Sequence, residues 1–469
     1  MYQYRQWDAA GGVAPQFASL GEILCAFSYA LDLTEGQPEG HSLRSCWMGT
    51  RLARAIGLPG AQLSDVYFTV LMKDLGCSSN AARVAEIYSA DDRLLKQGFK
   101  LVDGSVGQTL KFVLENTAPG AGWLRRAQAI GNIVRNGQSL VHELIQTRCT
   151  RGADIARQLR LSETVAEGIA HLDEHWNGSG KPRGISGTAI PIGSRIALLA
   201  QVADVYFAAA GPDAARAEVQ RRSGSWLDPE LVAAFLKLSA APEFWLGLAG
   251  DDIEQRVLAL EPASGLVMVD EDYLDAIVAA FGQVIDAKSP YTSGHSDRVG
   301  QYCDLVAAEL GYDEAARRAL RRAAMLHDVG KLGVSSTILE KPGKLEADEW
   351  HVMQSHATHT LRILQRVGVL SGMASIAAAH HERLDGKGYP HNLDATMISM
   401  DTRIITVCDF FDALTADRPY RAAMPVEKAL DIIGSEVDVA IDPRCFAALK
   451  AVVAGGVPQQ PLPEVDRLQ

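Results

Sequence analysis

One pattern occurs twice in this chain, and the repeat limits what the chain can fold into. Residues 40–44 read GHSLR, and residues 294–298 read GHSDR. In the same register and without a gap, residues 73–76 (KDLG) match residues 327–330 (HDVG). Matches that keep one order and one register over such a distance predict two repeats of a single domain.

A third match shows where the two copies differ in length. Residues 178–182 (GSGKP) match residues 386–390 (GKGYP), but in a register shifted from that of the first two matches. The first copy therefore holds extra residues, which we place between Cys77 and Arg148. A Pro/Gly/Ser break at residues 261–265 marks the predicted seam between the copies.

The hydrophobic pattern predicts an all-α protein. Apolar residues recur at three- and four-residue spacing, as in residues 305–310, where Gly311 ends the run. Alternating strand-like runs are scarce. We expect one helical domain over residues 1–262, a second over residues 270–455, and a flexible tail rich in Pro and Gln over residues 456–469.

Composition is typical of a cytoplasmic globular protein. Apolar residues make up 47% of the sequence and charged residues 22%. No run approaches the roughly 18 uninterrupted apolar residues of a membrane helix, and residues 1–8 do not read as a signal peptide. Seven scattered cysteines without a Cys-x-x-Cys pair predict a reducing cytoplasm. The net charge of −12 argues against binding to a nucleic acid polymer or an anionic membrane.

Histidines and aspartates in the second copy have the pattern of a metal centre. Imidazole and carboxylate ligands suit Fe, Mn and related ions, and the absence of Cys among them argues against a structural zinc. They lie on five separate predicted helices, whose side chains can converge inside a bundle. The predicted metal ligands are His295, His327, Asp328, His356, His380, His381 and Asp409.

Residues 270–453 closely resemble the HD-GYP family of bacterial cyclic dinucleotide phosphodiesterases, a subgroup of the HD phosphohydrolases. The resemblance rests on HDVGK at residues 327–331, HHE at 380–382, DGKGYP at 385–390 and DFFDALTADRPYR at 409–421. It implies two tandem HD-type helical domains, of which the C-terminal one carries the metal site. It also implies hydrolysis of cyclic di-GMP to pGpG or GMP.

The resemblance further implies roles for individual residues. It places two divalent ions, Fe or Mn, on the seven predicted ligands. We expect Asp328 to bridge the ions and a metal-bridged hydroxide to attack phosphorus in line, with Lys331 reaching the same phosphate. Some family members bind a third metal through a Glu where this chain has Tyr291, a poorer ligand, so we expect two metals rather than three. The predicted substrate contacts are Lys331, Lys387, Tyr389, Arg418 and Arg421.

The first copy lacks most of these ligands. His41 and Asp74 are kept, whereas the other five positions hold Lys73, Arg148, Leu172, Asp173 and Gln201. The two new cations would repel a metal ion, and we expect them to pair with the remaining aspartates. We therefore hypothesise that the N-terminal domain binds no metal pair and instead regulates, dimerises or binds a ligand. Two further histidines, His171 and His175, are expected to be exposed.

Other functions stay open at the level of sequence. The substrate is alternatively the mixed cyclic GMP-AMP, because the bases are read by pocket walls that the sequence does not show. A different class of function is a slow cyclic dinucleotide receptor, whose Gly388-Tyr389-Pro390 loop docks a partner such as a diguanylate cyclase. The complete ligand set with Lys331 favours turnover. By analogy with other inactive domain copies, we expect a homodimer.

Overall fold

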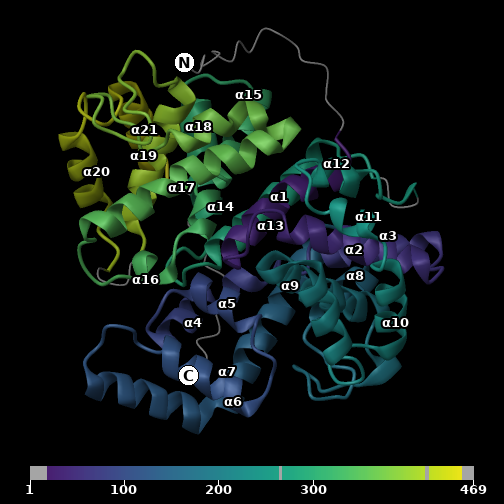
Figure 1. Ribbon diagram of the computed structural model, residues 1–469. Helices are drawn as coiled ribbons and strands as arrows, with labels where there is room; N and C mark the ends of the chain where they lie inside the picture. Colours follow the sequence, from purple (N-terminus) through teal and green to yellow (C-terminus); the bar gives the residue numbers. More distant parts are fainter. Residues whose placement is uncertain (1–17, 264–266, 418–421, 457–469) are drawn as a thin grey trace. The chain divides into compact units, whose positions relative to one another are not determined.

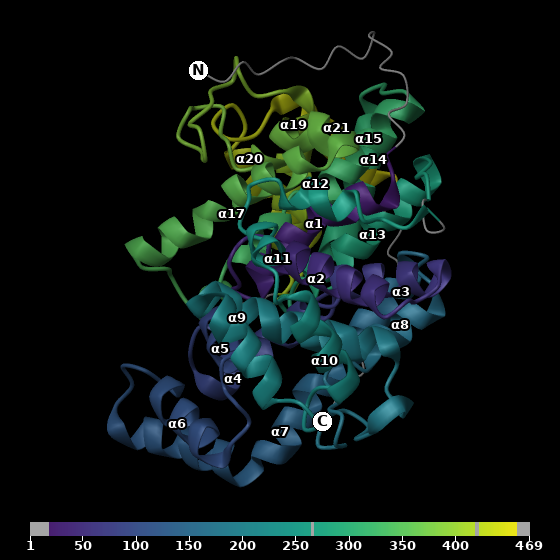
Figure 2. The ribbon, with the colours of Figure 1, turned by 45° about the vertical axis from the view of Figure 1, so that its right-hand side comes forward.

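The computed structural model describes residues 18–263, 267–417 and 422–456. Within these residues the fold is all-α as predicted, with isolated β-bridges and no β-strand. The chain divides into two compact units, and Figures 1 and 2 show the helices of each. Residues 264 and 265 of the predicted seam and nearly all of the predicted tail lie outside the described residues.

Unit 2 comprises residues 17–280 together with Leu332–Glu340. Its α-helices are α1 (Leu20–Thr34), α2 (His41–Ala55), α3 (Gly60–Leu71), α4 (Ala81–Tyr88), α5 (Asp92–Phe99), α6 (Val106–Asn116), α7 (Trp123–Gln158), α8 (Glu163–Ala170), α9 (Ile192–Arg221), α10 (Pro229–Leu238), α11 (Pro242–Leu246), α12 (Ile253–Leu258) and α16 (Ser336–Leu339). The described residues of this unit also form the short 3₁₀ helices η1 (Cys77–Asn80) and η2 (Gly187–Ala189).

Unit 1 comprises residues 1–16, 281–331 and 341–469. Its described helices are α14 (His295–Glu309), α15 (Glu314–Met325), α17 (Ala347–Arg366), α18 (Ala374–Ala378), α19 (Met400–Thr415), α20 (Val426–Ser435) and α21 (Pro443–Ala454). The 3₁₀ helix η5 (Gly368–Met373) precedes α18. Helix α13 (Glu271–Asp286) and the 3₁₀ helix η4 (Val329–Gly333) each span a boundary between the two units.

Polar residues cap the starts of several helices. At α1, Ser19 Oγ accepts a hydrogen bond from the backbone N–H of Glu22 over 3.1 Å, and the carboxylate of Glu22 accepts one from the backbone N–H of Ser19 over 2.8 Å. This reciprocal pair satisfies two backbone donors that the helix itself leaves free. Asp313 and Ser399 cap α15 and α19 through their side-chain oxygens.

The matched motifs share a close backbone approach in both units. A side chain at Gly76 would overlap the backbone oxygen of Arg148, and one at Gly330 would overlap the backbone oxygen of His356. Only glycine fits where a helix backbone comes this near. Arg148 and His356, which the repeat aligns with each other, therefore occupy the same position relative to the matched glycine in the two units.

The extra residues of the first copy form helices with a core of their own. They supply η1, α4, α5, α6 and the first part of α7. Buried Val84, Leu95, Val102 and Phe112 pack together there. The segment is thus a folded part of unit 2 rather than a loose loop.

One segment of the second copy packs within unit 2. In Leu332–Glu340, the backbone N–H of Ser336 donates to Asp92 Oδ1 over 2.7 Å, and Arg93 donates to the backbone oxygen of Gly333 over 2.5 Å. The sequence placed this segment inside the domain of residues 270–455. The predicted domain boundaries stay predictions.

Helix α9 is long and apolar enough to cross a membrane by length and composition alone. The same test is passed by core helices, and 67% of its apolar window is buried. Its backbone also breaks at Gly211, which is followed by Pro212. These features suit a core helix of unit 2.

Candidate metal centre

The seven predicted ligands come together in unit 1 from separate parts of the chain. His295 opens α14, His327 and Asp328 lie between α15 and η4, His356 lies in α17, His380 and His381 follow α18, and Asp409 lies in α19. The structure therefore gathers all seven predicted ligands in one place.

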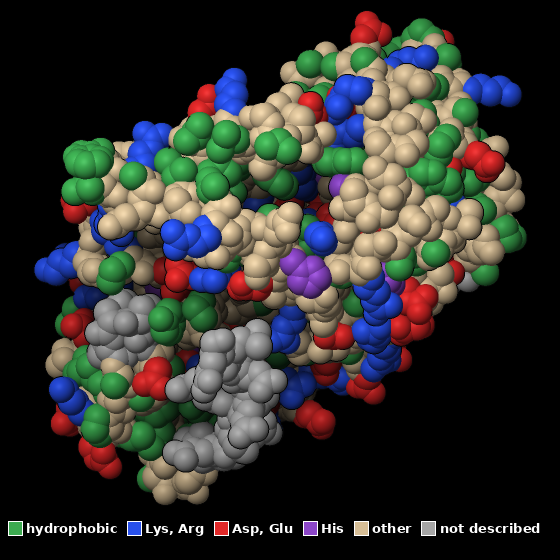
Figure 3. Space-filling view, turned by 90° about the horizontal axis from the view of Figure 1, so that it is seen from below, with side chains coloured by type: hydrophobic (Ala, Val, Ile, Leu, Met, Phe, Trp, Pro, Cys, Tyr) green, Lys and Arg blue, Asp and Glu red, His purple; other side chains and the backbone are tan. Residues whose placement is uncertain are grey.

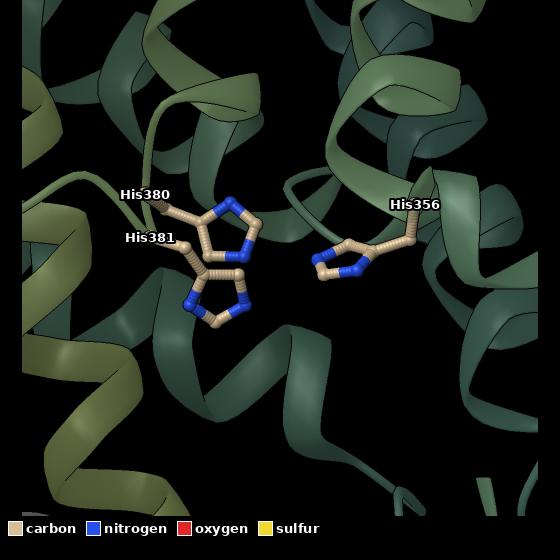
Figure 4. A group of neighbouring side chains, drawn as sticks. All are labelled: His356, His380 and His381. Carbon is tan, nitrogen blue, oxygen red and sulfur yellow. The ribbon is translucent and has the colours of Figure 1, made fainter. Parts of the chain in front are cut away.

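The ligands form two sets of three. In one set, ligand atoms of His295, His327 and Asp409 all lie within 4.8 Å of one another. In the other, the same holds for His356, His380 and His381, whose rings Figure 4 shows turned toward one another. Each set offers the number of protein ligands that leaves coordination positions open for water or substrate.

The carboxylate of Asp328 lies between the two sets. Its Oδ2 atom is 3.3 Å from His327 Nε2 and 3.7 Å from His295 Nε2. Its Oδ1 atom is 3.6 Å from the Nε2 atoms of both His356 and His380. One oxygen thus faces each set, which is the arrangement that a bridging carboxylate requires.

The histidine rings are held with one nitrogen free for a metal. The Nδ1 atoms of His327, His356 and His380 lie 2.6–2.7 Å from the backbone oxygen three residues earlier. An Nδ1–H that donates to this oxygen leaves a lone pair on Nε2. These Nε2 atoms and Asp328 Oδ1 are buried and have no hydrogen-bond partner among the described residues. Buried orphan acceptors of this kind fit a metal ion.

Burial keeps the second set neutral. It lowers the pKa of His356 to about 3 and that of His381 to about 4, and it lowers the pKa of His380 well below its ordinary value. For Asp328 burial acts in the opposite direction, yet His327 and Lys331 hold its pKa well below the ordinary value. Neutral imidazoles beside an ionised carboxylate are the ligand forms that a metal needs.

The predicted substrate contacts do not all lie beside the predicted metal ligands. The ammonium of Lys331 bonds to Asp328, and the ring of Tyr389 lies 4.8 Å from that of His381. Lys387 is exposed, with its Nζ 3.9 Å from Asp385. Arg418 and Arg421 lie outside the described residues. Contact of these side chains with a substrate stays a prediction.

The structure adds supporting residues that the sequence analysis did not single out. The Asp412 carboxylate accepts a hydrogen bond from His295 Nδ1 over 2.7 Å and from Arg298 Nε over 2.6 Å. The Thr360 hydroxyl donates to the backbone oxygen of His327 over 2.9 Å. Asp412 sits inside the matched motif, and its counterpart in unit 2, Asp204, lies 2.7 Å from His41 in the same way. An aspartate at the matched position of both copies was the sequence signal that could have pointed to this supporting role.

Cations fill the corresponding site of unit 2. The ammonium of Lys73 bonds to Asp74, and Arg148 bonds to Asp173, which confirms the predicted pairing. Lys73 is only 1% exposed. A positive charge therefore lies where unit 1 has the predicted ligand His327.

The extra residues add two more lysines to this site. Lys100 Nζ lies 2.7 Å from Glu35 and 3.9 Å from Asp74, and Lys96 Nζ lies 3.5 Å from Glu35. Glu35, Asp74 and Cys77 are themselves close enough to hold an ion. Their charges are already balanced by these ammonium groups, so the set is a poor metal site.

The prediction that His171 and His175 are exposed is wrong for His171, and His175 is half-buried. His171 is only 7% exposed, and its Nδ1 lies 2.8 Å from the backbone oxygen of Glu167. The ring of His175 stacks on Trp226 with centroids 4.2 Å apart. Helical spacing alone did not show that the loop carrying Trp226 covers this face.

Two metal ions held close together can stabilise both the attacking and the leaving oxygen when a phosphoester is hydrolysed. An all-α unit that gathers several histidines around an adjacent His-Asp pair, as unit 1 does, is typical of metal-dependent HD phosphohydrolases. The chain belongs to the HD-domain family, whose family model matches residues 120–231 and 280–445. Within that family it is an HD-GYP phosphodiesterase.

Similar proteins support this assignment. The chain is 50% identical over 438 residues to "3'3'-cGAMP-specific phosphodiesterase 3" of Vibrio cholerae, covering 93% of this chain and 95% of that one. A solved structure titled as a cyclic GMP-AMP phosphodiesterase of the same species matches with a TM-score of 0.65 and 47% identity, over 94% of this chain and 99% of that one. The "Cyclic di-GMP phosphodiesterase response regulator RpfG" of Xanthomonas campestris is 35% identical over 42% of this chain and 53% of its own length.

Proposed function

We propose that this metal-dependent phosphodiesterase hydrolyses a cyclic dinucleotide, and that 3'3'-cyclic GMP-AMP is its preferred substrate. The observation that carries the activity is the Asp328 carboxylate, with one oxygen facing each set of histidines. The sequence analysis put cyclic di-GMP first. The full-length similarity to a protein named for cyclic GMP-AMP favours the mixed dinucleotide.

Cyclic di-GMP is the second candidate. Relatives named as cyclic di-GMP phosphodiesterases share the centre, but two of them match only 42% and 35% of this chain. For either substrate the first cut opens the ring to a linear dinucleotide, pGpG from cyclic di-GMP. A second cut would give mononucleotides.

The residues of unit 1 have separate proposed roles in hydrolysis. Bound divalent cations would supply an activated water and neutralise charge on the phosphate oxygens. Asp328 would contribute one oxygen to each metal position, and Asp412 fixes the ring of His295. Lys331, 23% exposed and bonded to Asp328, is placed at the edge of the centre, where its charge can stabilise the phosphate.

We propose two metal ions, Fe or Mn. Two sets of three ligands with nitrogen and oxygen donors support this number and these ions. Tyr291 is 39% exposed and supplies no carboxylate, which argues against a third ion.

Unit 2 is proposed to bind no metal pair and to regulate unit 1 or dimerise. The support is its buried set of lysines and arginine paired with acidic groups.

The proposed location is the cytoplasm, since all seven cysteines are free and buried. The net charge of −12 argues against a nucleic acid polymer as substrate, and basic and acidic side chains are interspersed on the face that Figure 3 shows. Docking of a diguanylate cyclase stays a prediction.

The test is turnover by anaerobically purified protein. Cyclic GMP-AMP and cyclic di-GMP would be supplied separately and in competition, and products followed by chromatography. Lys331→Met should keep the bound metal and lower kcat about 100-fold, the scale of losing one electrostatic contact to the transition state. Faster cleavage of cyclic di-GMP would overturn the preference, and absence of cleavage of both would overturn the function.

A further inference from the structure

A large aromatic side chain lies unused beside the metal centre. Trp350, in α17, is 47% exposed. It precedes the metal ligand His356 by less than two helical turns, and it is the only tryptophan after residue 245 in the sequence. An exposed indole is the side chain that gains most from being covered by another flat ring.

Trp350 is connected to the centre through Tyr389. The two rings meet edge to face, with centroids 6.1 Å apart and planes at 79°. Tyr389 in turn lies 4.8 Å from His381 and 6.1 Å from His356. The rings thus form a row that begins at the second ligand set and ends at solvent, all within unit 1.

We propose that Trp350 and Tyr389 form a stacking surface for one purine base of the substrate. The inference rests on the proposed function and adds a base-binding subsite to it. The ring of Trp350 is two ring-to-ring steps from His381, one of 6.1 Å to Tyr389 and one of 4.8 Å from Tyr389 to His381. Trp350 is 47% exposed, so part of its ring remains accessible beside Tyr389, and bases stack on aromatic faces whatever their hydrogen-bonding edges.

The stacking surface would set affinity for the dinucleotide rather than the chemistry. Neither ring supplies a ligand to the metals, so both metal sets stay complete without Trp350. Removing a stacking residue typically weakens binding by about 5- to 150-fold. Trp350→Ala should therefore raise KM by this factor and leave kcat and metal content nearly unchanged.

The direct experiment is tryptophan fluorescence of the metal-loaded full chain. The probe is a phosphorothioate analogue of cyclic GMP-AMP that resists hydrolysis. It should quench the wild-type protein, and Trp350→Phe should remove that quenching while it keeps most of the affinity. Val352→Ala, an exposed neighbour in α17, is the matched control and should behave as wild type.

The outcomes separate the two claims. Unchanged KM in Trp350→Ala, or equal quenching in Trp350→Phe, overturns the stacking surface even if the enzyme is active. Quenching through Trp350 without any turnover of either dinucleotide keeps the subsite and overturns the proposed function.

Discussion

Asp412 Oδ2 accepts a hydrogen bond from His295 Nδ1 over 2.7 Å, and this bond turns the other nitrogen of the ring toward Asp328 and Asp409. A carboxylate behind a metal-binding histidine fixes the ring and makes it a stronger ligand. The same pair recurs in unit 2 as His41 and Asp204. Unit 2 has therefore kept the histidine–aspartate pair but lost most of the predicted metal ligands.

Asp412→Asn is expected to weaken metal binding by about 10- to 100-fold, the usual effect of losing such a partner. Metal content after dialysis against graded chelator would measure it. The matched control is Asp204→Asn, which disturbs the same bond in unit 2 and should leave metal affinity unchanged. Equal metal affinity in Asp412→Asn and wild type would contradict this role.

Lys73→Met is expected to destabilise the protein without affecting metal or turnover per folded molecule. The change leaves the buried carboxylate of Asp74 with the more distant ammonium of Lys100, 3.9 Å away, and the weak thiol donor of Cys77, 3.6 Å away. Removing one partner of a buried ion pair costs about 3 kcal/mol of unfolding free energy. Urea unfolding measures the loss. A variant as stable as wild type would show that the Lys73 ammonium is not the group that balances Asp74.

Stability should fall in mild acid because of His175. Burial lowers its pKa to about 4 in the folded chain, while the unfolded value is about 6.5. Between these pH values the unfolded chain binds more protons, so the free energy of unfolding decreases as pH falls, by about 2 kcal/mol at pH 5. Its contribution is fully present above pH 6.5.

His175→Phe keeps a ring to stack on Trp226 and removes this titration. Urea unfolding at pH 7.5 and 5.0 should therefore show a smaller acid loss than wild type. The exposed His142 serves as the control position, and His142→Phe should not change the pH dependence. An unchanged acid loss in His175→Phe would show that another group is responsible.

The sequence predicted the helical fold, and it picked out the seven candidate ligands that the structure brings together, because their information is local. Each ligand lies in a short motif with its own spacing, such as HDVGK or HHE. What the sequence missed depends on distant contacts. Lys96, in α5, and Lys100, just after α5, both lie in the extra segment of the first copy. Their ammonium groups approach Glu35 in the site of unit 2 that corresponds to the metal centre. No sequence pattern in the extra segment predicts this contact.

Two other features were hidden for the same reason. The segment Leu332–Glu340 reads as part of the catalytic domain, yet hydrogen bonds to Asp92 and Arg93 place it in unit 2. His175 reads as an exposed histidine until the loop of Trp226 covers it. Each depends on tertiary packing, which residue spacing does not encode.

The most direct test of the account is metal content per chain in Asp328→Asn and Asp74→Asn, measured by mass spectrometry after anaerobic purification. Wild type and Asp74→Asn should each carry two Fe or Mn ions. Asp328→Asn should carry fewer than one and lose cyclic dinucleotide hydrolysis, since one carboxylate faces both ligand sets. Two ions retained in Asp328→Asn, or a loss of metal in Asp74→Asn, would contradict the bridging role and the division between the two units.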